Sequence, residues 1–231
     1  MSDQAQLVER FTDVMAKFTA FFGKRLPDDV YEKLEEMRRV QKSELAELIY
    51  DAMFTDLDMA KARNVPFCQD TGVIQYHIEL GADFPIRNEL EACLKEAVRR
   101  ATKAAPLRHN AVQIFDERNT GDNTGHRIPW IDLEIVPNST DAVIYAYMAG
   151  GGCSLPGAAK VLMPVEGYEA VVQFIFDTIC ERGVNACPPL LVGVGIAPHE
   201  GIVAAHDRMV EKLLGQTGVR AFVLGHDQQP R

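Results

Sequence analysis

The stretch Val73-Ile-Gln-Tyr-His-Ile-Glu-Leu80 decides the fold class, because apolar and polar side chains alternate along most of it. Such alternation predicts a β-strand with one face turned to a core. Residues 88–105 instead repeat their apolar side chains at intervals of three and four, which predicts an amphipathic helix. The expected buried face of that helix is Leu90, Leu94, Ala97, Val98 and Ala101.

The first 65 residues are expected to be helical. A first helix is predicted from an apolar face at helical spacing, made of Leu7, Phe11, Val14, Phe18 and Phe21. The run Leu26-Pro27-Asp28-Asp29 ends this helix and begins a second, because proline and acidic residues are favoured in a first turn. A third helix is predicted from Ser43, and its inward side chains are expected to be Leu45, Leu48, Ile49, Ala52 and Met53.

Strands and helices are expected to alternate in the rest of the chain. The predicted strands are 130–136, 142–148, 190–196 and a short edge strand at 221–224, and the predicted helices are 167–180 and 201–214. The helix at 167–180 is expected to bury Val171, Val172, Ile175 and Ile179. The predicted fold class is therefore α+β, with a helical N-terminal region (1–65) followed by a mixed α/β domain. We expect residues 1–231 to form one domain, with the site residues in 66–200 and a divergent segment at 201–231.

Composition and charge argue against two classes of protein, those that bind nucleic acid and those that span a membrane. Lysine and arginine number 24 against 33 aspartates and glutamates, so the net charge is −9 and a basic nucleic-acid-binding face is not expected. The sequence has no apolar run long enough to span a bilayer and no signal-like N-terminus, so we expect a cytoplasmic protein without membrane contact. The five cysteines are an odd number and widely spaced, which favours reduced thiols, metal ligands or a nucleophile over disulfides.

Two cysteines stand at junctions between predicted elements. Cys68 lies in the run Cys68-Gln-Asp-Thr-Gly72, before the first strand, and Cys187 precedes two prolines. Loops at such junctions present side chains to a cavity, although a small buried thiol would fit either position equally well. Cys93 and Cys180 fall at apolar positions of predicted helices and are expected in the core. Neither junction has C-x-x-C spacing, so a zinc ribbon or thioredoxin motif is not indicated.

Three further features are candidates for binding or catalysis. The run 150–157 is rich in glycine, but Ala158 stands where a phosphate-binding P-loop needs lysine, so it is either a tight turn or a close approach to a ligand. Arg108 follows a predicted helix, and arginine suits bidentate recognition of a carboxylate, although a lone loop arginine is commonly a surface residue. A nucleophilic pair of Cys68 with His109 is a further alternative.

Several of these segments together resemble one family. They are, in order, Cys68-Gln-Asp-Thr-Gly72, Ala105-Pro-Leu-Arg-His-Asn-Ala111, Asn119-Thr-Gly-Asp-Asn-Thr-Gly125, Met148-Ala-Gly-Gly-Gly-Cys-Ser-Leu-Pro-Gly157, Lys160-Val-Leu-Met-Pro164 and Asn185-Ala-Cys-Pro-Pro-Leu-Leu-Val-Gly-Val-Gly-Ile196. The chain thus resembles, from about residue 7 to about residue 200, the alpha part of the iron–sulfur hydro-lyases, which include class I fumarases. The triple-glycine run is more similar to the branch that dehydrates L(+)-tartrate.

The resemblance implies a [4Fe–4S] cluster held by three cysteines, with one iron open to a hydroxy-dicarboxylate substrate. Cys68 and Cys187 match two of the cluster ligands, and soft thiolates suit iron–sulfur ligation. The open iron would act as a Lewis acid in removing water from L(+)-tartrate to give oxaloacetate. Arg108 and Gly151 match substrate-binding positions, and Gln69 and Asp70 match positions that contact the substrate and orient the surroundings of the cluster.

The same resemblance implies a partner. The proton-abstracting base of the family lies on the beta part, so we expect a separate beta subunit and an assembly of two alpha and two beta chains. The third cluster cysteine of the family lies beyond Cys187, where this sequence has no cysteine. A shortened form, completion by another chain, and loss of catalysis are the three explanations. The alternatives in function are a fumarase-type alpha subunit acting on fumarate or malate, a non-catalytic relative, and an enzyme that uses Cys68 as nucleophile.

Overall fold

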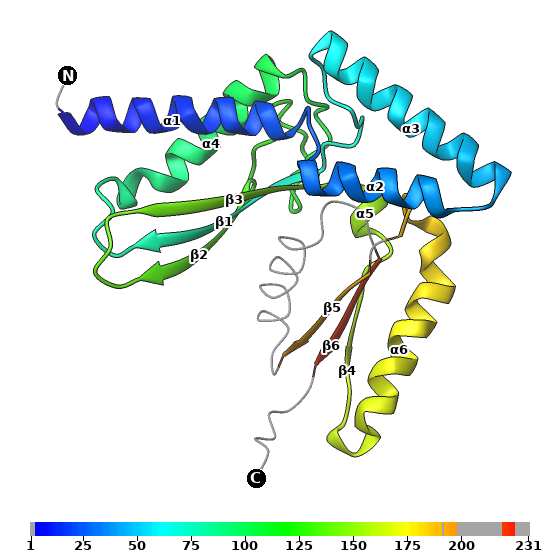
Figure 1. Cartoon of the computed structure of the whole chain (residues 1–231). Helices are drawn as coiled ribbons and strands as arrows, with labels where there is room; N and C mark the ends of the chain where they lie inside the picture. The colour runs from blue at the N-terminus through cyan, green and yellow to red at the C-terminus, as the bar shows by residue number, and fades with distance from the viewer. Residues whose placement is uncertain (1–2, 191, 198–218, 225–231) are drawn as a thin grey trace. The chain divides into compact units, whose positions relative to one another are not determined.

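The chain forms two compact units, and the boundary between them in the sequence falls between Met148 and Ala149 (Figure 1). The computed structural model describes residues 3–190, 192–197 and 219–224. None of the helices in these described ranges is long and apolar enough to cross a membrane. Helices at the N-terminus followed by sheets with helices confirm the predicted α+β class. The single domain over residues 1–231 stays a prediction.

The first unit combines helices with a three-stranded sheet. Its elements are α1 (Asp3–Phe22), α2 (Asp28–Val40), α3 (Glu44–Arg63), β1 (Val73–Gly81), a 3₁₀ turn (Arg87–Glu89), α4 (Leu90–Ala104), β2 (Trp130–Val136) and β3 (Ala142–Ala149). The strand order is β2-β1-β3, so the stretch that decided the fold class is the central strand. Strands β1 and β2 are parallel, with Gln75 opposite Trp130.

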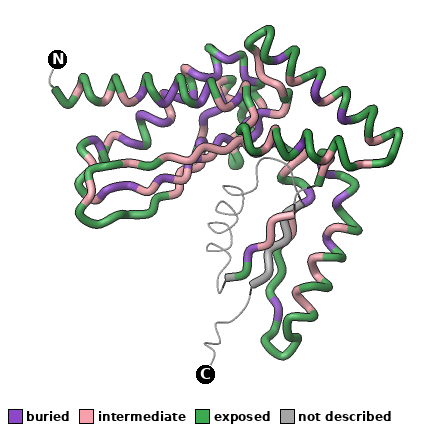
Figure 2. Tube along the Cα trace, in the orientation of Figure 1, coloured by how far each residue is buried: buried purple, intermediate pink, exposed green. Residues whose placement is uncertain are grey.

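Strand β1 carries the core of the first unit. Its inward side chains Ile74, Tyr76, Ile78 and Leu80 are fully buried, as the alternation predicts. Figure 2 colours the buried and intermediate positions along the chain. Helices α1 and α4 cover this face, and all five apolar residues predicted for α4 are buried. The Tyr76 hydroxyl shares a hydrogen bond of 2.5 Å with Thr19 Oγ1. Burial raises the pKa of Tyr76 well above its ordinary value, so the phenol stays neutral.

The first predicted helix is confirmed as α1, but the apolar face from which it was predicted is not the buried one. Leu7, Val14, Phe18 and Phe21 are exposed, and of the five residues only Phe11 packs against the core. The buried residues of α1 are Thr12, Met15, Ala16, Thr19 and Ala20. Small side chains bring α1 close to its neighbours, and the larger apolar residues occupy the adjacent stripe of the helix.

Helices α2 and α3 form a smaller core of Leu34, Tyr50 and Phe54. The predicted starts are confirmed: α2 begins directly after Pro27, and Ser43 Oγ caps α3 by accepting from Ala46 N–H at 3.4 Å. The predicted inward face of α3 was wrong, because four of its five residues are exposed: Leu45, Leu48, Ile49 and Ala52. The aromatic residues Tyr50 and Phe54 occupy the contact with α2 instead.

The second unit contains an all-parallel sheet in the order β4-β6-β5. Its elements are α5 (Gly151–Ser154), β4 (Ala158–Val161), a 3₁₀ turn (Pro164–Glu166), α6 (Gly167–Arg182), a second 3₁₀ turn (Gly183–Asn185), β5 (Val192–Ala197) and β6 (Val219–Leu224). Strand β6 lies between β4 and β5 and pairs with both. It is therefore the central strand of this sheet, and the expectation that residues 221–224 form an edge strand was wrong. A parallel central strand needs partners distant in sequence, which a local pattern does not reveal.

Helix α6 begins where predicted, but its buried stripe is narrower. Val171, Ile175 and Ile179 are partly buried, whereas Val172 is half exposed. Cys180 is exposed and not in the core, in contrast to Cys93 of α4, which is buried as expected. The predicted helix at 201–214 lies outside the described residues.

Candidate functional site

The first part of the site is the loop between α3 and β1. Helix α3 ends at Asn64, which adopts the left-handed conformation, and the loop then carries the exposed residues Cys68 and Gln69. The N–H of the half-buried Asp70 donates to Cys68 Sγ at 3.4 Å. Gly72 has a φ of +63°, which a glycine adopts at little cost, and it turns the chain into β1.

Asn110 joins this loop to the segment that follows α4. Its Nδ2 donates to Asp70 Oδ1 at 2.5 Å, and its Oδ1 accepts from Gly72 N–H at 2.9 Å. One amide side chain therefore fixes two positions of the Cys68 loop. The structure thus brings Cys68, Gln69 and Asp70 into the same region as the segment of Arg108. The sequence analysis did not single out Asn110, although it stands two residues after Arg108.

The backbone of Arg108 is fixed while its side chain is left available. Asn123 is fully buried and donates from Nδ2 to the carbonyl of Arg108 at 3.1 Å and to Thr102 Oγ1 at 3.3 Å. Asn123 Oδ1 also accepts from Ala111 N–H at 3.5 Å. The guanidinium of Arg108 is exposed and makes no hydrogen bond or ion pair with the described residues. It is therefore free to bind an anionic ligand.

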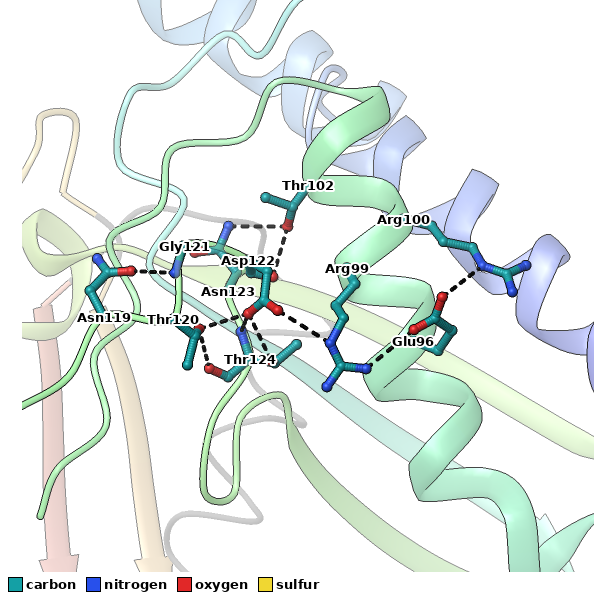
Figure 3. A network of polar contacts seen from close by, with 10 residues as sticks. All are labelled: Glu96, Arg99, Arg100, Thr102, Asn119, Thr120, Gly121, Asp122, Asn123 and Thr124. Carbon is teal, nitrogen blue, oxygen red and sulfur yellow. Dashed lines mark hydrogen bonds and ion pairs between the residues drawn. The ribbon is translucent and has the colours of Figure 1, made fainter. Parts of the chain in front are cut away.

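A polar network around Asp122 connects the loop at residues 119–125 to helix α4 (Figure 3). The Asp122 carboxylate accepts from the hydroxyls of Thr120 and Thr124, each at 2.7 Å, and pairs with Arg99 of α4 at 3.2 Å. Burial alone would raise the pKa of Asp122, but these hydrogen bonds and the arginine charge outweigh it and lower the pKa. The turn-rich run 119–125 is consequently an ordered loop anchored to α4.

A second group of candidate residues lies in the second unit, where the triple glycine meets Cys187. A Cβ at Gly152 would lie 2.6 Å from Cys187 Sγ, so the sulfur can keep its present position only beside a glycine. Gly150 and Gly151 begin the short helix α5, and the Gly150 carbonyl accepts from Ser154 N–H at 3.0 Å. Gly151 and Cys187 are both exposed, and Gly152 connects their segments. The glycine run therefore lets the backbone come close to the Cys187 sulfur, in addition to turning the chain.

Both candidate thiols suit a soft metal centre, but they do not complete one. Cys68 and Cys187 are exposed, and neither forms a disulfide with another described residue. The Thr71 hydroxyl beside Cys68 is buried without a hydrogen-bond partner in the described part of the chain, a polar group that a bound centre could satisfy. The described residues contain no group of three His, Cys, Asp or Glu that could hold a metal ion. The residues therefore fit as part of a ligand set and need a further ligand.

Comparison with known proteins gives a consistent result. A sequence model described as fumarate hydratase (fumerase) matches residues 12–216. The L(+)-tartrate dehydratase subunit alpha of Escherichia coli K12 is 52% identical over 196 residues, which cover 85% of this chain and 65% of that relative. The corresponding Shigella sonnei protein matches equally well. The putative L(+)-tartrate dehydratase subunit alpha of Methanocaldococcus jannaschii is 31% identical over 81% of this chain and 67% of its own length.

Proposed function

The chain belongs to the fumarate hydratase (fumerase) family of hydro-lyases, and from this premise we propose that it is the alpha subunit of an L(+)-tartrate dehydratase, forming oxaloacetate. Identity of 52% to tartrate-dehydratase alpha subunits supports the substrate. The observation that carries the proposal is the Asn110 side chain, which joins the loop of a candidate cluster ligand to the loop of a carboxylate-binding arginine.

The residues of the first unit have separate roles in this proposal. The Arg108 guanidinium binds one substrate carboxylate through two parallel hydrogen bonds. The Gln69 amide, which is exposed beside Cys68, donates to the substrate. The Asp70 carboxylate accepts a hydrogen bond from a substrate hydroxyl, while its bond to Asn110 fixes its orientation. The exposed backbone at Gly151 lets the substrate approach the second unit's segment closely.

Cys68 and Cys187 would hold a [4Fe–4S] cluster together with a third thiolate, for which this sequence has no cysteine after Cys187. When bound, this group supplies a Lewis-acidic iron that eases departure of a hydroxyl. The Asp70 N–H donates to Cys68 Sγ and fixes its position in the loop, and Gly152 leaves room for the Cys187 sulfur. A beta subunit is expected because the relatives are named as alpha subunits, and the family resemblance implies that this subunit carries the proton-abstracting base.

Anaerobic reconstitution with iron and sulfide tests the ligand assignment. The chain is co-purified with its cognate beta-type chain, and visible absorption is recorded for the unaltered protein and for Cys68→Ser and Cys187→Ser. We expect a broad absorption that each substitution abolishes. Cys180→Ser is the matched control, because Cys180 is equally exposed but has no assigned role. A complex that stays colourless would contradict the cluster and favour a non-catalytic relative.

The runner-up substrate is fumarate or malate, and the family description supports it directly. Comparing kcat/KM for L(+)-tartrate with that for malate in the reconstituted complex separates the two. We expect a preference for tartrate, and a preference for malate would assign a fumarase-type alpha subunit. Activity that survives chelation but is lost on thiol alkylation would instead identify Cys68 as a nucleophile.

A further inference from the structure

A pocket of about 670 Å³ lies within the first unit, between the carboxyl-terminal halves of α1, α3 and α4. Ala16 and Ala20, one turn apart on α1, and Ala60 of α3 are buried and line it. Alanine side chains are too short to fill the space between these helices, so a hollow remains. Its volume lies in the range of roughly 300–1,000 Å³ that is typical of small-molecule sites.

The pocket is rich in positive charge, although the chain as a whole is acidic. The net charge of the chain is −9. Among the described residues, the only carboxylate that lines the pocket is that of Asp13, and the cations that line it are Lys17, Lys24, Arg25, Lys61 and Arg100. A concave surface lined by one sign of charge concentrates ions of the opposite sign.

Two of these cations are already paired with carboxylates. Arg100 Nη1 lies 2.7 Å from Glu9 Oε1, and Arg100 Nε lies 3.1 Å from Glu96 Oε1. Lys17 Nζ lies 3.2 Å from Asp13 Oδ2. These two residues therefore add little to the positive potential of the pocket.

The other three cations have no carboxylate within ion-pair distance in the described part of the chain. Lys24 Nζ donates to the neutral amide oxygen of Asn64 at 3.0 Å. The Arg25 guanidinium lies 5.4 Å from the centre of the Phe21 ring. The Lys61 ammonium makes no hydrogen bond with a described residue. Three positive charges at one pocket thus lack a counter-charge.

The helix ends at the pocket offset this charge only in part. Helix α1 ends at Phe22, α3 at Arg63 and α4 at Ala104. The carboxyl-terminal end of a helix carries about half a negative charge, so three ends offset about half of the three uncompensated positive charges. A net positive potential therefore remains in the pocket.

We propose that this pocket binds a small organic anion, whose phosphate or carboxylate group lies among Lys24, Arg25 and Lys61. Lysine and arginine donate charge-assisted hydrogen bonds to both kinds of group. The apolar part of the ligand packs against the alanine side chains. No residue assigned to the tartrate site lines the pocket, so this ligand can be measured whether or not the chain forms oxaloacetate.

Titration calorimetry of the full 231-residue chain with phenylphosphate and with benzoate tests this proposal. Both probes join an anionic group to the same ring, so the stronger one identifies the preferred group. Benzyl alcohol has the ring without the charge and is expected to bind about tenfold more weakly, or less. Salt at about 1 M should weaken the anions, because it shortens the Debye length to about 3 Å. Equal binding of benzyl alcohol, or no binding of either anion, would overturn the proposal.

A charge variant and a matched control test the three cations. The variant is Lys24→Gln/Arg25→Gln/Lys61→Gln. It is expected to bind the preferred anion about tenfold more weakly, or less. The control removes three exposed cations of the same unit that do not line the pocket, and is Lys42→Gln/Arg63→Gln/Lys103→Gln. It should bind within about threefold of the unaltered chain, because distant exposed charges are screened. An equal loss in both variants would contradict a specific pocket.

Three further variants test where the anion binds. Ala104→Leu fills the pocket from its exposed wall and is expected to weaken binding, whereas Ala92→Leu, at an exposed position of α4 outside the pocket, is not. Arg108→Gln is expected to bind the anion as the unaltered chain does. If Arg108→Gln abolishes binding while Ala104→Leu does not, the anion occupies the candidate site. The pocket proposal is then overturned and the proposed function stands.

Discussion

At the scale of single residues, two contacts explain why the candidate loops have their present form. Asn110 uses both ends of its amide to hold Asp70 and Gly72. Gly152 leaves space that the Cys187 sulfur occupies. Sequence patterns identified the loops but not these partners, because a hydrogen bond between residues 40 positions apart leaves no local periodicity.

Removing the Asn110 amide is expected to lower activity more than stability. Asn110→Ala leaves Asp70 without its fixed partner, and loss of such supporting hydrogen bonds costs roughly 10- to 100-fold in activity or metal affinity. We expect kcat for tartrate to fall by that factor in the reconstituted complex. Asn88→Ala is the control, because Asn88 is exposed on the same unit. An unchanged kcat would show that Asn110 does not position the site.

Adding one methyl group at Gly152 is expected to displace the Cys187 sulfur. The new Cβ would lie 2.6 Å from Sγ, closer than van der Waals contact allows. Gly152→Ala should therefore reduce the visible absorption of the reconstituted complex, while the far-ultraviolet circular dichroism stays unchanged. Ser154→Ala, at the exposed end of α5, is the control. Full absorption in Gly152→Ala would show that the sulfur position is not critical.

At the scale of elements, sequence patterns predicted the buried face correctly where the apolar residues of an element lie on one face only. They did not identify the buried face of a helix that has apolar residues on two adjacent faces. The buried faces of β1 and α4 follow from their spacing alone. In α1 and α3 the largest apolar side chains are exposed, and small or aromatic residues on another stripe make the contacts. The position of β6 between β4 and β5 depends on pairing distant in sequence, which no short pattern contains.

The hydrogen bond between Thr19 of α1 and Tyr76 of β1 is expected to stabilise the first unit. Thr19→Val would leave the fully buried Tyr76 hydroxyl without this partner, at a cost of about 1–3 kcal/mol in the free energy of unfolding. Urea denaturation measures this difference. Thr55→Val is the control, since the Thr55 hydroxyl is exposed and bonds only to the carbonyl of Asp51 in its own helix. Equal stability of the two variants would contradict the prediction.

The Asp122 network should make the first unit sensitive to acid. The folded-state pKa of Asp122 is lowered from its ordinary value of 3.8, so its contribution to stability is fully present at higher pH. It is lost as the pH falls below about 4 and through the lowered folded-state pKa. Asp122→Asn should therefore lose stability at neutral pH, and the difference from the unaltered chain should shrink on acidification. Asp83→Asn, on an exposed aspartate, is the control. A difference that does not vary with pH would contradict this account.

At the scale of the whole molecule, candidate site residues occur in both compact units. The first supplies Cys68, Asp70 and Arg108, and the second supplies Gly151 and Cys187. Recognition of the motifs predicted this set from sequence, whereas the supporting residues Asn110, Asn123 and Gly152 became evident only from three-dimensional contacts. The matched region spans 65% of the length of the Escherichia coli relative.

Oxaloacetate formation from L(+)-tartrate by the complex with the cognate beta-type chain tests the central claim most directly. The complex is assayed without oxygen, first after reconstitution with iron and sulfide, then after iron chelation, and again after iron and sulfide are returned. The account predicts activity that chelation abolishes and that the returned iron and sulfide restore. A reconstituted complex that forms no oxaloacetate, or one whose activity chelation leaves unchanged, would contradict it.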